Sequence, residues 1–207
     1  MARTGRPRGF SRDEAVDRAM HLFWRHGYEA TSLNQLKRAM GGISPASFYA
    51  AFGSKEALFR EAVARYLDTH GQVTASLWDE VLAPRGAIEQ ALRHSARMQT
   101  DVAHPSGCMI ILSATGCSPD NAHLEAHLRK ARQGNRTAML GCVERAITSG
   151  ELGSDTDAIA LSTMFDGLLV GFSTQARDGV PVEAMNAAIT QAMAVWDVSG
   201  SRASRSG

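Results

Sequence analysis

The segment TSLNQLKRAMGGISPASFYAAFGSKEAL covers residues 31–58 and contains two short helical patterns separated by paired glycines. Gly41-Gly42 ends the first pattern. Ser44 can cap the second helix, with Pro45 at its first position, where a missing N–H costs nothing. Two short helices joined by a tight turn with glycine are typical of a helix-turn-helix, whose second helix enters the DNA major groove.

Helices flank this unit on both sides. Ser11 can cap a preceding helix that Gly27 ends, and Ser54 can cap a long helix that follows. Thr31 or Ser32 begins the first short helix. Helices this short are not stable alone, so they need an apolar core shared with the preceding helix. The expected core consists of Leu22, Phe23, Leu33, Leu36, Ile43, Phe48, Phe52 and Leu58.

Charge is distributed unevenly along the chain. Residues 1–60 carry ten Lys and Arg against five Asp and Glu, whereas the whole chain has a net charge of only +1. A basic N-terminal part on an acidic remainder suggests that the basic part meets a polyanion such as nucleic acid. The alternative is an ordinary fluctuation of surface charge.

The outer side of the second short helix and its surroundings supply candidate DNA contacts. Small side chains let a helix come close enough to contact base edges, and hydroxyl groups and cations can bind phosphate oxygens. Lys55 adds a cation to the positive end of a helix dipole, and three arginines form an N-terminal arm able to reach a groove. Alternatively, Ser44, Ser54 and Thr31 act only as helix caps. The candidate set is Arg3, Arg6, Arg8, Thr31, Ser32, Ser44, Pro45, Ala46, Ser47, Tyr49, Ala50 and Lys55.

Three segments resemble the DNA-binding domain of the TetR family of regulators in both order and spacing. They read GYEATSL at 27–33, GIS at 42–44 and SFYAAFGSKEAL at 47–58. The resemblance covers about residues 10–59. It implies an all-α homodimer that binds a palindromic operator in double-stranded DNA, usually as a repressor that a small-molecule effector releases.

The resemblance also implies roles for single residues. It implies that Thr31, Tyr49 and Lys55, which match phosphate-contacting positions of the family, contact DNA phosphates. It also implies that the second short helix contacts the bases. Two positions depart from the family pattern. The turn holds Gly41-Gly42 where the family usually has one residue fewer, so the approach of the recognition helix is expected to differ. Ala50 stands where the family often has His or another polar residue, so one phosphate contact is expected to be missing.

The rest of the chain is also patterned as helices. We expect these at 84–103, 108–114, 120–149, from Ser154 or Asp155 to Arg177, and from Pro181 onward. The fold class is therefore all-α, with an N-terminal three-helix helix-turn-helix domain and a C-terminal helical bundle. We divide the chain into a DNA-binding domain (1–59), a ligand-binding and dimerisation domain (60–198) and a disordered tail (199–207).

The last two helices carry wide apolar surfaces that must be buried in a core or at an interface. We predict a two-fold, four-helix dimer interface there, with the core of a monomer as the alternative. The predicted interface residues are Leu161, Leu168, Phe172, Met185, Ile189, Met193 and Trp196.

An effector pocket is expected between helices of the C-terminal domain. The lining candidates favour an apolar or aromatic effector, although such residues also fill ordinary cores. They are Trp78, Met98, Cys108, Met109, Leu112, Met139 and Phe165.

Other functions have weaker signals. His123 and His127 share a helix face, and Cys108 and Cys117 flank an apolar run, so a metal- or redox-responsive regulator is the alternative. Surface histidines and buried thiols explain both patterns without a sensor.

We predict no metal, no cofactor and no enzyme activity, because no phosphate loop or nucleophile motif is present. With no membrane-spanning run or signal peptide, we expect a cytoplasmic protein without a membrane partner.

Overall fold

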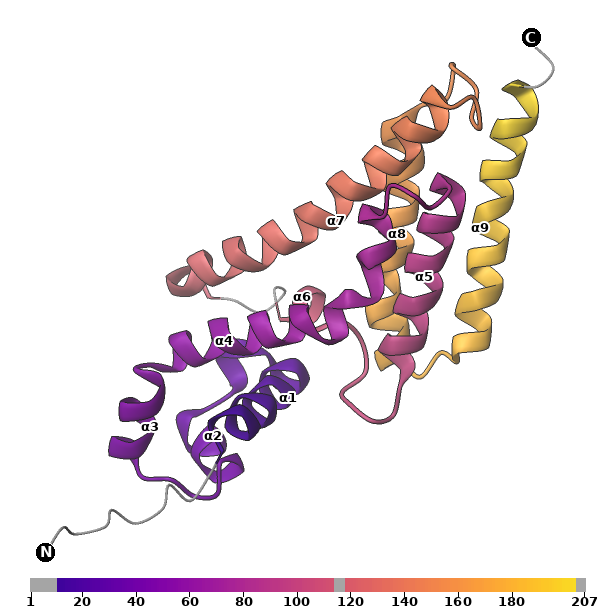
Figure 1. Ribbon diagram of the computed structural model, residues 1–207. Coiled ribbons are helices and arrows are strands. Elements are labelled where there is room, and N and C mark those ends of the chain that lie inside the picture. The colour runs from indigo at the N-terminus through magenta and orange to yellow at the C-terminus, as the bar shows by residue number, and fades with distance from the viewer. Residues whose placement is uncertain (1–10, 114–117, 204–207) are drawn as a thin grey trace, which may run out of the picture.

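The computed structural model describes residues 11–113 and 118–203, and within these ranges every regular element is a helix (Figure 1). This confirms the predicted all-α fold. The N-terminal elements are α1 (Arg12–Ala30), α2 (Leu33–Ala39), α3 (Pro45–Phe52) and α4 (Lys55–Asp68). The others are η1 (His70–Trp78), α5 (Pro84–Thr100), α6 (Met109–Leu112), η2 (Pro119–Asn121), α7 (Ala122–Thr148), α8 (Ala158–Arg177) and α9 (Val182–Ala203).

Helices α1 to α4 form a head around one apolar core. Phe23, Leu36, Phe48 and Leu58 are fully buried there, as the sequence predicts. Leu22, Leu33 and Ile43 of the expected core are only partly buried, and pack against it from the edge. The same core also takes in Met109 and Ile110 of α6 and Leu124 and Leu128 of α7. The head is therefore packed onto the rest of the molecule and is not a free-standing unit.

Serine caps set the helix starts in the head. Ser11 and Ser54 cap α1 and α4, as expected. Ser32, rather than Thr31, caps α2. Its Oγ accepts a hydrogen bond from Gln35 N at 3.2 Å, while Gln35 Oε1 accepts one from Ser32 N at 2.7 Å. This reciprocal pair satisfies two backbone donors that the helix leaves open.

The body is built around α5, which packs against η1, α7, α8 and α9. Figure 1 shows α7 running from the head to the far end of the body, with α9 beside α5. The body core includes Ile88 and Leu92 of α5, Met139 of α7, Phe165 of α8 and Trp196 of α9. In the described part of the chain, no helix is long and apolar enough to cross a membrane.

Three features differ from the predicted pattern. The 3-10 helix η1 was not expected, because its short apolar run gives no clear period. Helix α8 begins at Ala158, capped by Asp157, and so starts after the expected Ser154 or Asp155. Helix α9 continues to Ala203, into the segment predicted as a disordered tail. There the Ser199 hydroxyl donates to a carbonyl one turn earlier, which fits a helical backbone.

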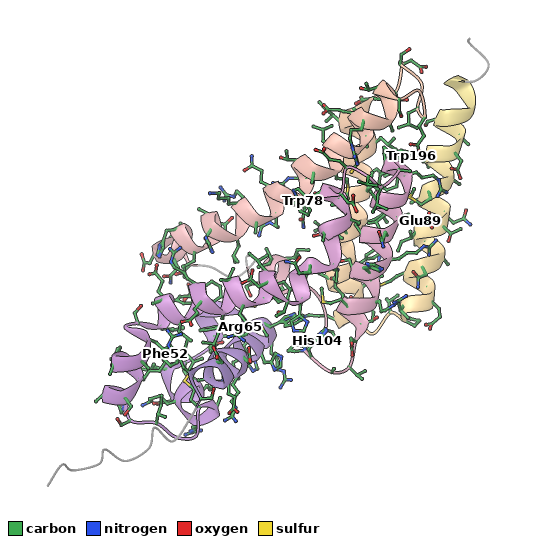
Figure 2. The ribbon with its side chains drawn as sticks, viewed as in Figure 1. Phe52, Arg65, Trp78, Glu89, His104 and Trp196 are labelled. Atoms are coloured by element: carbon green, nitrogen blue, oxygen red, sulfur yellow. The ribbon has the colours of Figure 1, made fainter. Side chains whose placement is uncertain are left out.

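A joint between head and body is centred on Trp24 of α1. Its Nε1 donates to Gly107 O at 2.9 Å, and its ring stacks on His104 with centroids 4.5 Å apart. Arg177 at the end of α8 donates to the carbonyls of Trp24 (2.9 Å) and Arg25 (3.1 Å). Figure 2 shows His104 lying between the two halves. These contacts set the orientation of the head.

Gly107 is the residue of this joint that tolerates no side chain. Its φ is +83°, and an added Cβ would lie 2.7 Å from Ser173 O and 2.5 Å from Leu112 Cδ1. We expect Gly107→Ala to lower the free energy of unfolding by about 2–4 kcal/mol, since strain at positive φ adds to overpacking. Urea unfolding at fixed protein concentration measures the change.

Gly134→Ala is the matched control, because Gly134 lies inside α7 with nothing within 4 Å of an added Cβ. It should raise the unfolding free energy by about 0.5–1 kcal/mol. Equal effects of the two substitutions would contradict the described packing at Gly107.

Candidate nucleic-acid interface

Helix α3 presents one face to solvent and one to the head core. Ser44 caps the helix by accepting a hydrogen bond from Ser47 N at 3.1 Å, and Pro45 occupies the first helical position. Phe48 and Phe52 are buried and hold the inner face. The residues on the outer side are exposed, and five of the six are small: Ser44, Pro45, Ala46, Ser47, Tyr49 and Ala50. Such a face can approach a groove closely.

The paired glycines form the turn before α3. Both Gly41 (φ 84°) and Gly42 (φ 75°) have left-handed backbones, which glycine adopts without strain. Gly41 N donates to Arg38 O at 3.1 Å and Gly42 N donates to Lys37 O at 2.9 Å, closing the end of α2. The turn thus accommodates both glycines as two consecutive residues with left-handed backbone conformation, and Phe48 of α3 is still buried in the core.

Tyr49 on α3 and Lys55 at the start of α4 are the larger polar candidates for DNA contact. Tyr49 is 52% exposed, and its ring meets Phe48 edge-on. Lys55 begins α4, and its Nζ lies 4.2 Å from the centroid of the Tyr28 ring. Partial burial lowers the pKa of Lys55, and Glu29 opposes that shift. The ammonium group therefore lies against the Tyr28 ring, within the electrostatic influence of the Glu29 carboxylate.

The structure corrects the prediction for Thr31. Its side chain is fully buried, and its hydroxyl donates to Gly27 O at 2.6 Å, so it secures the end of α1 and presents no hydroxyl to solvent. Ser32 is exposed but also serves as the cap of α2. Arg3, Arg6 and Arg8 lie outside the described residues.

Two carboxylates of the head hold the start of α7. Glu29 Oε1 accepts hydrogen bonds from Ser118 N and Asn121 Nδ2, both at 2.8 Å. Hydrogen bonds from Ser118 and Asn121 lower the pKa of Glu29 to about 2. Glu56 Oε2 lies 3.1 Å from His123 Nε2, and the pKa of Glu56 is lowered mainly by that contact. Helices α1 and α4 of the head are therefore tied to the start of α7 at a second point, away from Trp24.

A cavity lies between the end of α4, η1, α5, α6, α7 and α8. Of the predicted pocket residues, Met98 and Cys108 line it. The other five do not, because an apolar pattern shows that a side chain is buried without showing against what. Trp78 is 55% exposed, Leu112 is half-buried elsewhere, Met109 lies in the head core, and Met139 and Phe165 lie in the body core.

The predicted dimer residues also need correction. All belong to the body core of a single protomer, where Leu168 is partly buried and the others are buried: Leu161, Leu168, Phe172, Met185, Ile189, Met193 and Trp196. Figure 2 places Trp196 on α9 in the body, and its indole Nε1 donates to Glu151 Oε1 at 3.1 Å. These side chains therefore pack mainly within one protomer, and Leu168 is the one among them that is only partly buried there.

The alternative of a redox- or metal-responsive regulator depends on the surroundings of the cysteines and of His123 and His127. Cys108 Sγ accepts a hydrogen bond from the Tyr66 hydroxyl at 3.3 Å, and burial raises the pKa of the thiol. Burial also raises the pKa of Cys142. Cys117 lies outside the described residues. His123 Nε2 lies 3.1 Å from Glu56 Oε2, and among the described residues no group of three or more His, Cys, Asp or Glu side chains is placed to hold a metal ion.

Sequence reasoning missed Trp24, Arg177 and Asp166. Trp24 and Arg177 are joined by tertiary contacts that no local pattern encodes. Asp166, which lines the cavity, did leave a signal, because it is the single charged residue in the apolar stretch 158–172 of α8. A carboxylate at such a position needs a partner or a solvent-filled space.

Comparison with known proteins agrees with this architecture. Residues 15–62 match the family described as bacterial regulatory proteins, tetR family, and residues 84–193 match the tetracyclin repressor-like C-terminal domain. The HTH-type transcriptional repressor ComR of Escherichia coli K12 is 34% identical over 195 residues, covering 93% of this chain and 91% of that protein. The repressor BdcR of the same organism is 26% identical, covering 92% and 90%.

Solved structures are similar over nearly the whole chain. A cysteine mutant of the TetR family transcriptional regulator CifR, complexed with 26-bp double-strand operator DNA, is 39% identical with a TM-score of 0.84. The match covers 93% of this chain and 100% of that one. A TetR-type regulator from Rhodococcus sp. RHA1 is 35% identical with a TM-score of 0.59, covering 87% and 96%.

The Glu29 contact makes stability depend on pH. Its folded pKa of about 2 is below the ordinary value of 4.5, so its contribution is present above pH 4.5 and is lost as pH falls toward 2. We expect Glu29→Gln to be less stable than wild type at pH 7, with the difference shrinking below pH 4.5. Urea unfolding from pH 7 to pH 3 measures this.

Glu183→Gln is the control, since Glu183 is exposed in the first turn of α9 and makes no hydrogen bond or ion pair among the described residues. Its loss of stability at pH 7 should be smaller. If both variants respond alike, Glu29 does not hold the start of α7.

Proposed function

The chain belongs to the TetR family of bacterial regulators, and from this premise we propose that it binds a palindromic operator as a homodimer and represses transcription until a small-molecule effector releases it. Residues 1–59 bind DNA, and residues 60–198 provide dimerisation and effector binding. The exposed, small-residue face of α3 is the observation that carries the DNA-binding proposal.

Helix α3 enters the major groove in this proposal. Ser44, Ala46, Ser47 and Ala50 face base edges, which their small side chains allow to approach. Tyr49 and Lys55 contact phosphates on either side, where the exposed hydroxyl and the positioned ammonium group suit anionic oxygens. Ser32 and Pro45 lie beside these contacts, and the arm with Arg3, Arg6 and Arg8 reaches a neighbouring groove or the backbone. Thr31 contributes by ordering the end of α1.

The dimer forms through the outer faces of α8 and α9. These faces are exposed, and the residues that form them are uncharged and mostly small, which permits close helix approach; the larger Gln191 also lies on the α9 face, and Glu183 borders it. On α8 they are Ala160, Thr163, Gly167, Val170 and Thr174, and on α9 Ala184, Ala187, Ala188, Ala194, Val195 and Val198. A second copy of this chain, related by a two-fold axis, is the occupant that would bury both faces in a four-helix arrangement.

The cavity of the body is the proposed effector site. It is bounded by α6, and Cys108 on its wall directly follows Gly107, the acceptor of the Trp24 hydrogen bond. An effector that displaces this wall would act on the joint, and through it on α3. The raised pKa of Cys108 keeps its thiol protonated, which favours reversible ligand binding over thiolate chemistry at this residue.

Phosphate contacts are tested by Tyr49→Phe and Lys55→Ala. After selection of the operator from a random DNA pool, we expect Tyr49→Phe to weaken binding about fivefold per protomer, equally for specific and unrelated DNA. Lys55→Ala should reduce the slope of log affinity against log salt concentration by about 2 per dimer. Fluorescence anisotropy titrations measure both.

Lys130→Ala is the lysine-matched control, because Lys130 is exposed on α7 outside the proposed contact surface. It should change neither affinity nor salt slope. If Tyr49→Phe and Lys55→Ala also behave like wild type, the proposed placement of α3 on DNA is wrong.

The dimer is tested by the double substitution Val195→Glu and Val198→Glu. These valines are 44% and 57% exposed in one protomer, and unpaired carboxylates would be buried if the faces meet. We expect a monomer by light scattering, unchanged helix content by circular dichroism, and operator affinity reduced at least tenfold. Val102→Glu, at a 99% exposed valine outside both faces, should remain dimeric. A dimer that survives the double substitution excludes this interface.

A further inference from the structure

The cavity of the body is small. Its volume is about 70 Å³, which is room for about five water-sized groups. Pockets that hold drug-sized ligands are several times larger, at roughly 300–1,000 Å³. In this conformation the cavity therefore favours an occupant with few non-hydrogen atoms.

Most polar side chains on the cavity wall already have partners. Gln99 Nε2 donates to Ser95 Oγ at 2.8 Å, and Gln99 Oε1 accepts from Ser173 Oγ at 2.6 Å. The Thr74 hydroxyl donates to Asn135 Oδ1 at 3.3 Å. These groups form a fixed polar rim on walls that are otherwise apolar, including Met98, Ile110, Ile111 and Leu169.

Asp166 is the exception. It is half-buried on α8, it lines the cavity, and among the described residues it makes no hydrogen bond or ion pair. Burial raises the pKa of Asp166, while Arg136 and Arg132 oppose that rise. A partly desolvated carboxylate needs a hydrogen-bond donor, and the cavity is the space from which a donor can come.

The charges around the cavity do not favour an ionic occupant. The Arg132 guanidinium lies on the wall, where it donates to Ile110 O at 3.1 Å, and Arg136 is near enough to act on Asp166. A cationic ligand would be attracted by Asp166 but repelled by the two arginines, and an anionic ligand would be attracted by the arginines but repelled by Asp166, so the opposing charges offset each other for either ion. Either ion would also lose its hydration on entering a mostly apolar space. An uncharged ligand avoids this loss.

Resting on the effector function proposed above, we propose that the cavity binds an uncharged molecule of about five non-hydrogen atoms whose hydroxyl group donates a hydrogen bond to Asp166. The apolar part of the molecule packs against Met98, Ile110 and Leu169. Its hydroxyl lies beside the rim of Ser95, Gln99 and Asn135. Asp166 is thus the residue that determines effector specificity.

Two isomers of one formula test the hydroxyl requirement. 1-Butanol and diethyl ether have the same five non-hydrogen atoms, but only the alcohol can donate a hydrogen bond. Butylammonium and propionate supply a cation and an anion of similar size. Dissociation constants for the full-length protein at pH 8 are measured by ligand-observed nuclear magnetic resonance. We expect 1-butanol to bind at least tenfold more tightly than each of the other three.

Substitutions of Asp166 test whether the preference for 1-butanol over diethyl ether arises in the cavity. Asp166→Ala should bring the affinities for 1-butanol and diethyl ether within twofold of each other, while Asp166→Asn, whose amide oxygen still accepts a hydrogen bond, retains part of the preference. Glu183→Ala removes an exposed carboxylate of α9 and should leave the preference as in wild type. Circular dichroism and thermal unfolding verify that each variant is folded.

Several results would overturn the proposal: equal binding of the two isomers by wild type, tighter binding of either ion, binding of none of the four, or a preference that persists in folded Asp166→Ala. The operator affinity of the ligand-free wild type is measured in parallel. A chain that fails to bind any selected DNA refutes the regulatory function itself, whereas the ligand preferences are read without DNA and stand or fall separately.

Discussion

Trp24 joins the two halves of this protein. Its indole is fully buried, donates to Gly107 O, stacks on His104 and meets the Tyr66 ring edge-on at 4.8 Å. Its own carbonyl accepts a hydrogen bond from Arg177 of α8. Through its side chain and its own carbonyl, this one residue of α1 therefore contacts α4, the loop before α6 and the end of α8. Because an indole is rigid and its N–H requires a partner when buried, the position of the head follows from the position of that loop.

The same joint lies between the cavity wall and the head, which carries the proposed DNA-binding surface. Tyr66 packs against Trp24 on one side and donates to Cys108 on the cavity wall on the other. Packed interiors resist continuous deformation, so a displaced wall moves neighbouring helices as units. Coupling between two sites typically amounts to about 1–3 kcal/mol. One hydrogen bond and one stacked ring pair at Trp24 are of the right size to carry such a coupling.

The head could be predicted from the sequence because its signals are local. Serines at 11, 44 and 54 cap helices within three residues of themselves, and the paired glycines end α2 by their own backbone conformation. Thr31 shows the limit of this reasoning. A hydroxyl near a helix start suits both a cap and a phosphate contact, and only the packing of α1 against α2 decides that it points inward to Gly27 O.

The body could be predicted only as a set of helices, because its roles depend on which helix covers which. The apolar stripe of α9, with Ile189 and Trp196, correctly indicated burial but gave no information on the partner, which is α5 of the same protomer. Because the apolar stripe of α9 packs against α5, the opposite face of α9 is the one that remains available to a partner. Val195 and Val198 are exposed there among alanines, without a charge to keep the face in water. The proposed association therefore rests on the uncharged residues of the outer face rather than on the apolar residues of the inner one.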